Sequence, residues 1–162
     1  MKYLFRGGTV VSGRGTRRAD VLVEDEKILR VARSITAPEA AVIDVEGQLL
    51  LPGFIDAHIH LESSLVSPKE FAKAVLPHGT TTVITDPHEI ANVMGTDGIE
   101  YMLQATEDLP VDVRFMLPSC VPATPLDESG AILDYRAIDS FYDHPRVQGL
   151  AEMMNFVGAI NG

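Results

Sequence analysis

The chain has 162 residues, of which 46% are hydrophobic and 22% are charged, and its formal net charge is -10. This composition is that of a globular protein rather than a disordered one. The negative charge repels phosphate backbones and anionic lipid surfaces, so nucleic-acid and membrane partners are not expected.

Cys120 is the only cysteine, so the chain can form no internal disulfide and a reducing compartment is expected. The single thiol also excludes zinc sites that need two cysteine ligands. No segment reaches the roughly 20 apolar residues of a membrane span, and charged and glycine residues interrupt the N-terminal stretch. We therefore expect a cytoplasmic protein in which imidazole and carboxylate groups hold any metal.

The first fifty residues consist of short β-prone runs separated by turn residues. The runs cover residues 3–5, 9–11, 21–24, 28–32 and 42–45. They carry few large side chains with which to close a core. A small all-β unit is predicted, with a boundary at Pro52-Gly53.

Beyond this boundary, apolar strands alternate with amphipathic helices, which is typical of a parallel α/β sheet or barrel. The predicted strands cover residues 54–59, 81–85, 113–117 and 147–151, and their apolar runs predict burial on both faces. Helices are predicted after Ser67, from Asp97 and after Asp134. These four β/α units make about half of a (β/α)₈ barrel, which takes about 250 residues.

Two histidines stand at the end of the first strand of the α/β part. Asp56, His58 and His60 are two residues apart, so on a strand they share one face. At the carboxyl end of a barrel strand, two convergent imidazoles form half of a metal site. Taken alone, an H-x-H pair is also compatible with surface histidines near a turn.

The segment PGFIDAHIH at residues 52–60 resembles the entry signature of the amidohydrolase superfamily. Further segments resemble the bacterial adenine deaminase family and follow that family's order along the chain. They are HLESS at 60–64, LPHGTTT at 76–82, DPHEIANV at 86–93, LPSCVPATP at 117–125 and GLAEMMNF at 149–156.

The resemblance implies a distorted TIM-like barrel flanked by a β-sandwich. Residues 1–51 would be the N-terminal part of the sandwich, and residues 52–162 the first half of the barrel. It also implies hydrolysis of adenine, a purine base, to hypoxanthine and ammonia by a metal-activated water. The cofactor would be two divalent ions, manganese or iron, with zinc as an alternative.

By the same resemblance, His58 and His60 match the metal ligands of the first strand. Glu152 matches the fourth-strand carboxylate that bridges the two ions, and it is the catalytic residue expected in this chain. The strand prediction agrees, because Glu152 directly follows residues 147–151 and would point into the barrel mouth. Without the motif, Glu152 would be read as a surface or helix-capping acid.

Asp86, His88 and Glu89 form a second polar cluster just past the second strand. They are candidates for binding substrate or an accessory metal. Alternatively, Pro87 ends the strand and Glu89 begins a helix.

Glu62, with Ser63 and Ser64, is a further candidate from the loop that follows His60. These side chains could orient the two histidines. They could equally be ordinary loop residues.

In amidohydrolases, the other metal histidines and the proton-shuttling aspartate come from later strands, which this sequence does not contain. The chain is thus expected to be an N-terminal fragment with negligible activity alone. The uncovered strand edges predict a homo-oligomer, or association with a polypeptide carrying the missing C-terminal part.

Three other interpretations remain open at this stage. The first is another amidohydrolase, acting on a cyclic amide or amidine. The second is a non-catalytic metal-binding or assembly module. The third, a flavodoxin-like domain with incidental histidines, is disfavoured because no glycine-rich phosphate loop follows the first strand.

Overall fold

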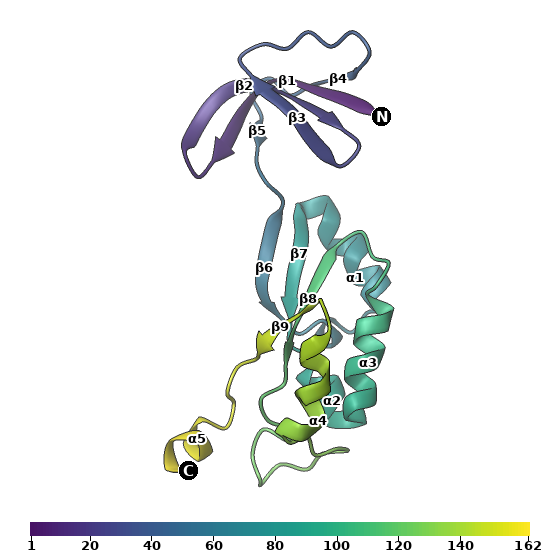
Figure 1. Ribbon diagram of the computed structural model, residues 1–162, viewed down its shortest axis with the longest axis vertical. Helices are drawn as coiled ribbons and strands as arrows, with labels where there is room; N and C mark the ends of the chain where they lie inside the picture. The colour runs from purple at the N-terminus through teal and green to yellow at the C-terminus, as the bar shows by residue number, and fades with distance from the viewer. The chain divides into compact units, whose positions relative to one another are not determined.

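The computed structural model describes residues 1–162 as two compact units, Met1–Pro52 and Gly53–Gly162 (Figure 1). Each unit contains its own sheet and its own cluster of buried apolar side chains. None of the helices has the length and apolar character that crossing a bilayer requires.

The first unit is one five-stranded sheet. Its strands are β1 (Lys2–Ser12), β2 (Gly15–Glu24), β3 (Lys27–Ala32), β4 (Ala41–Asp44) and β5 (Leu49–Leu50). The order is β3-β2-β1-β4, and β5 also pairs with β1. The hairpin partners β1, β2 and β3 are antiparallel, whereas β4 and β5 run parallel to β1. Its buried cluster is small, built on Leu4, Ile35 and Ala37.

The sequence predicted two short runs on either side of Gly7-Gly8, and this prediction was wrong in one respect. A single strand, β1, continues through the two glycines with a register shift between Phe5 and Gly8. Gly7 adopts a φ of 80°, a conformation that glycine reaches without steric cost, so the strand bulges instead of ending.

The second unit alternates parallel strands with helices. Its strands are β6 (Phe54–Ile59), β7 (Thr80–Thr85), β8 (Asp112–Leu117) and β9 (Val147–Leu150), paired in that order and all parallel. The helices are α1 (Pro68–Val75), α2 (His88–Met94), α3 (Thr96–Ala105), α4 (Tyr135–Asp139) and α5 (Phe156–Asn161). Short 3₁₀ turns cover Glu62–Ser64, Leu76–His78 and Ser140–Asp143. The predicted parallel α/β arrangement is confirmed.

The predicted helix starts are confirmed by their caps. The Ser67 hydroxyl accepts a hydrogen bond from the Glu70 backbone N–H, and Pro68 occupies the first turn of α1. The Asp134 carboxylate accepts from two backbone N–H groups at the start of α4. The second helix begins at Thr96, one residue before the predicted Asp97.

Burial of all four strands on both faces was predicted, and this was wrong. Helices α1 to α4 gather along one side of the β6–β9 sheet (Figure 1), and along β8 the residues Val113, Phe115 and Leu117 are buried while their neighbours are not. On β6, Phe54 is 54% and Ile55 is 64% exposed. The reason is geometric: the helices cover only one face of this open sheet, so side chains on the other face stay exposed (Figure 1).

Candidate metal centre

His58 and His60 lie where β6 ends, at a local irregularity of the strand. Asp56 pairs with Val83 and Ile59 with Thr85, so β6 advances three residues while β7 advances two. Such a bulge re-aims the side chains beside it. Here it places the two imidazoles close enough for their Nε2 atoms to lie 3.1 Å apart.

Glu152, which follows β9 by two residues, reaches the same point. Its Oε1 lies 3.7 Å from His58 Nε2 and 3.7 Å from His60 Nε2. With metal–ligand bonds of about 2.1 Å, two ligand atoms of one ion lie at most about 4.2 Å apart. All three separations satisfy this limit, so the donor triangle fits one divalent ion.

The backbone of the neighbouring strand orients His60. Its Nδ1 lies 2.9 Å from the carbonyl oxygen of Asp86, which can only accept, so Nδ1 carries the proton. Nε2 is then left with a free lone pair that faces His58 and Glu152. A metal-ligating histidine needs this tautomer, and a hydrogen bond from the other ring nitrogen normally fixes it.

Asp86, His88 and Glu89 form a second cluster that adjoins the first. Asp86 is 4% exposed, and its Oδ2 lies 3.1 Å from His88 Nδ1. Glu89 Oε2 lies 3.4 Å from His60 Nδ1 and 3.8 Å from His88 Nδ1. Ligand atoms of two further triads converge within 4.8 Å, His60 with His88 and Glu89, and Asp86 with His88 and Glu152.

The structural alternative for this cluster also holds, since His88 and Glu89 are the first two residues of α2 and Pro87 precedes them. A helix start and a ligand cluster are compatible, because the first turn of a helix presents its side chains at the strand ends of a barrel.

Glu62 lies beside Glu89 at the start of α2, and it forms no hydrogen bond or ion pair with His58 or His60. Its Oε1 accepts a hydrogen bond from the Ile90 backbone N–H at 3.2 Å, and the Ser63 hydroxyl donates to Glu89 Oε1 at 2.6 Å. Ser64 donates to the Leu61 carbonyl within its own turn. Glu62 and Ser63 therefore hold Glu89 and the start of α2.

Three carboxylate oxygens of these clusters are buried without any hydrogen-bond partner: Glu62 Oε2, Asp86 Oδ1 and Glu89 Oε2. Buried carboxylate oxygens are normally hydrogen-bonded or bound to a cation, because leaving them unpaired costs desolvation energy. Unpaired carboxylate oxygens gathered next to imidazole nitrogens suit a hard or borderline divalent ion.

The pKa shifts describe the same surplus of negative charge. Burial raises the pKa of Asp86, against the influence of His88, and burial together with the neighbouring Glu89 raises the pKa of Glu62. Burial alone would lower the pKa of His60, but its bond to the Asp86 carbonyl and the nearby carboxylates outweigh burial and raise it. A bound cation would supply the missing positive charge.

Ser119 is a residue of this site that sequence analysis did not single out. Its hydroxyl donates a hydrogen bond to the backbone carbonyl of Glu152, and the Ala151 backbone N–H donates to the Leu117 carbonyl at 2.8 Å. These two bonds join the chain after β8 to the chain after β9. They fix the backbone from which the Glu152 carboxylate extends.

A cavity of about 450 Å³ opens beside the second cluster. Its lining includes His88, Glu89, Asn92, Cys120 and Met154. Two of these lining residues, His88 and Glu89, belong to the second cluster.

Residues 49–158 match the Amidohydrolase family. The chain belongs to the amidohydrolase family. This family is metal-dependent, and the groups that could hold metal in this member are those described above. The resemblance found in the motifs is confirmed.

Among the relatives of this amidohydrolase is an adenine deaminase of Nitratidesulfovibrio vulgaris, 62% identical over 122 residues, which cover 75% of this chain and 21% of the relative. An adenine deaminase of Bacillus velezensis is 48% identical over 165 residues, which cover 91% of this chain and 29% of the relative. The chain thus spans less than a third of the length of these curated relatives.

A solved D-hydantoinase (dihydropyrimidinase) from Thermus sp. resembles this amidohydrolase in structure, with a TM-score of 0.58 and 27% identity over 72% of this chain and 27% of that one. The predicted fold class is confirmed: the β6–β9 unit is part of a TIM-like barrel, and a separate β-sheet precedes it.

Proposed function

We propose that this chain supplies the first-strand and fourth-strand metal ligands of an adenine deaminase, which hydrolyses adenine to hypoxanthine and ammonia. The observation that carries the proposal is the triangle of His58 Nε2, His60 Nε2 and Glu152 Oε1, with sides of 3.1, 3.7 and 3.7 Å. The substrate class is supported by the 48% to 62% identity with adenine deaminases. Residues 1–51 and 52–162 would be parts of the sandwich and of the barrel.

In this proposal His58 Nε2, His60 Nε2 and Glu152 Oε1 would together hold one divalent ion. The other oxygen of Glu152 would be available to a second ion. One carboxylate can serve two ions because each of its oxygens can bind one and offset their mutual repulsion. Asp86, His88 and Glu89 would hold an accessory ion or the polar edge of the substrate. The imidazole and carboxylate donors suit manganese, iron or zinc.

Bound divalent ions would supply a lowered pKa for water, so that a hydroxide nucleophile is available near neutral pH. The protein's own contribution is positional. The Asp86 carbonyl holds the His60 tautomer, and Ser119 holds the Glu152 backbone. A purine base in the adjoining cavity would lie against His88 and Glu89 of the second cluster. Proton transfer to the ring and the leaving amine needs a further acid or base, which we expect from outside this chain.

A chimera tests the proposal directly. In the adenine deaminase of Nitratidesulfovibrio vulgaris, the 122 aligned residues would be replaced by those of this chain. Adenine turnover, measured by ammonia release, should persist and should be lost with His58→Ala or Glu152→Gln. His144→Ala is the matched control, since His144 accepts from the Arg146 backbone N–H and belongs to none of the candidate ligand groups. A folded, metal-loaded chimera that leaves adenine unchanged would refute the assignment.

The structural likeness to a D-hydantoinase favours a second candidate, hydrolysis of a cyclic amide. Its 27% identity is well below the identity with the adenine deaminases. Offering dihydropyrimidines to the same chimera separates the two candidates, since only the second predicts their turnover.

A further inference from the structure

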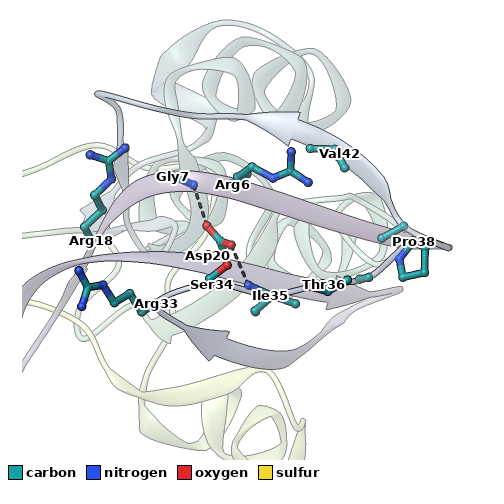
Figure 2. A pocket seen from close by; sticks show the side chains of 12 residues that line it. Arg6, Gly7, Arg18, Asp20, Arg33, Ser34, Ile35, Thr36, Pro38 and Val42 are labelled. Carbon is teal, nitrogen blue, oxygen red and sulfur yellow. Dashed lines mark hydrogen bonds between the residues drawn. The ribbon is translucent and has the colours of Figure 1, made fainter.

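The first unit contains a cavity of about 510 Å³ whose walls carry three arginines. Arg6 comes from β1, Arg18 from β2 and Arg33 from the segment after β3. In Figure 2, Arg18 and Arg33 lie at one end of the pocket and Arg6 extends towards Val42, with Asp20 between them. Arg18 and Arg33 also line a second cavity.

The only acidic side chain of the cavity, Asp20, is occupied by backbone hydrogen bonds. Asp20 is 5% exposed, and each of its oxygens accepts a hydrogen bond of 2.9 Å from a backbone N–H, one from Gly7 and one from Ile35. Figure 2 shows both bonds. Asp20 thus ties β1 to the segment after β3 and forms no ion pair with an arginine.

The cavity therefore offers many donors and few acceptors. Arg18 pairs with Glu46, whereas the guanidinium groups of Arg6 and Arg33 have neither an ion-pair nor a hydrogen-bond partner. The hydroxyls of Ser34 and Thr36 are also unpaired. Guanidinium groups bind phosphate and carboxylate bidentately, and several around one hollow favour an anion with more than one charged oxygen.

Basic surface of this kind is local to the first unit. Residues 1–52 contain eight lysines and arginines against seven acidic residues, whereas residues 53–162 contain five against sixteen. The first unit therefore has a net charge close to zero, whereas the second unit is strongly acidic and repels anions.

We propose that the cavity lined by Arg6, Arg18 and Arg33 binds a small multivalent oxyanion, namely the phosphate or carboxylate groups of a small molecule. The ligand displaces water from the two unpaired guanidinium groups and accepts from the hydroxyls of Ser34 and Thr36. The site uses no residue of the metal centre. The two proposals can therefore be tested separately, and failure of one does not contradict the other.

The test is titration of the whole chain with inorganic phosphate, pyrophosphate and citrate at constant ionic strength, followed by calorimetry and by NMR of the arginine Nε–H groups. Saturable binding that shifts the Arg6 and Arg33 signals is expected, and the arm that saturates at the lowest concentration identifies the phosphate or carboxylate source. The double variant Arg6→Gln/Arg33→Gln should bind at least about tenfold more weakly, a change of about 1.4 kcal/mol.

Arg30→Gln is the matched control, since Arg30 lies on β3 but lines neither cavity. It should leave the affinity unchanged. Arg33→Lys, which keeps the charge but removes the planar fork, should weaken binding while the chain stays folded by circular dichroism. Absence of saturable binding in all three arms, or equal weakening by Arg30→Gln, overturns the proposal.

Discussion

At the residue scale, hydrogen bonds to the backbone fix the conformation of two of the three candidate ligands. His60 is held by a backbone carbonyl, and Glu152 extends from a backbone that Ser119 holds. His58 has no such partner, although its backbone N–H donates to Asp56 Oδ1 at 3.2 Å. Metal affinity depends on such supporting bonds, which commonly contribute 10- to 100-fold.

Ser119→Ala should therefore weaken metal binding more than it weakens the fold. Loss of the hydroxyl removes one hydrogen bond to the Glu152 carbonyl, which costs about 1 kcal/mol of stability. The displaced carboxylate should lower Mn²⁺ affinity by about tenfold, measured by electron paramagnetic resonance of the free ion. Ser119→Thr, which keeps the hydroxyl, should restore it.

Ser129→Ala is the control for this prediction. Its hydroxyl also donates to a backbone carbonyl, that of Ala131 at 2.7 Å, but neither residue is a candidate ligand or bonds one. It should cost similar stability and leave the Mn²⁺ affinity unchanged. Equal losses of affinity in the two alanine variants would show that Ser119 acts only on the fold.

Strand alternation and the predicted strand ends put His58, His60 and Glu152 at the ends of two strands, but only the resemblance to the amidohydrolase family marked them as candidate metal ligands. The sequence could not reveal the Asp86 carbonyl as the partner of His60, because every residue has a backbone carbonyl and the residue type does not show which one is used. Ser119 was inside a quoted motif, but a serine after a strand has too many uses to be assigned. Its partner lies 33 residues away and is also a backbone group.

At the scale of elements, the strands and helix starts were predictable where a local rule applied. Ser67 and Asp134 cap their helices as expected, and β6 has the predicted bounds. The one-sided burial of the sheet was not predictable, because the apolar pattern of a strand is the same whether or not its second face is covered. Helix α2 was offered only as an alternative, since it is seven residues long and follows a proline.

The contact between α2 and α3 supports the second cluster, and it depends on Gly98. A Cβ atom at this position would lie 2.8 Å from the Ile90 carbonyl oxygen, closer than atoms normally approach. Ile90 directly follows Glu89 and donates its N–H to Glu62. The glycine therefore allows α3 to press against the turn that carries the cluster.

Gly98→Ala should destabilise the second unit, although alanine is the better helix former. The helix-propensity gain is about 1 kcal/mol, whereas forcing a methyl group into a packed backbone contact costs about 1 to 3 kcal/mol. Urea unfolding should show a net loss. Glu100→Ala, on the exposed side of the same helix, should stay within about 0.5 kcal/mol. A gain of stability with Gly98→Ala would mean that α2 and α3 separate easily.

At the scale of the whole molecule, the barrel unit leaves two strand edges without partners within the described chain. The sheet order β6-β7-β8-β9 ends on β6 and β9. Both edge strands expose apolar side chains, Ile55 on β6 and Leu150, at 46%, on β9. Unpaired edges that are also apolar are the surfaces through which sheets associate.

The isolated chain should thus self-associate as its concentration rises, and Ile55→Lys should reduce this association. A lysine on an edge strand opposes pairing, because docking would bury its charge. Multi-angle light scattering over a concentration series measures the effect. Leu126→Lys is the matched control, since Leu126 is 95% exposed but lies in a loop. If Leu126→Lys reduces the apparent mass as much as Ile55→Lys, general surface hydrophobicity and not edge pairing drives association. If the unaltered chain stays monomeric, the edges of β6 and β9 are already protected.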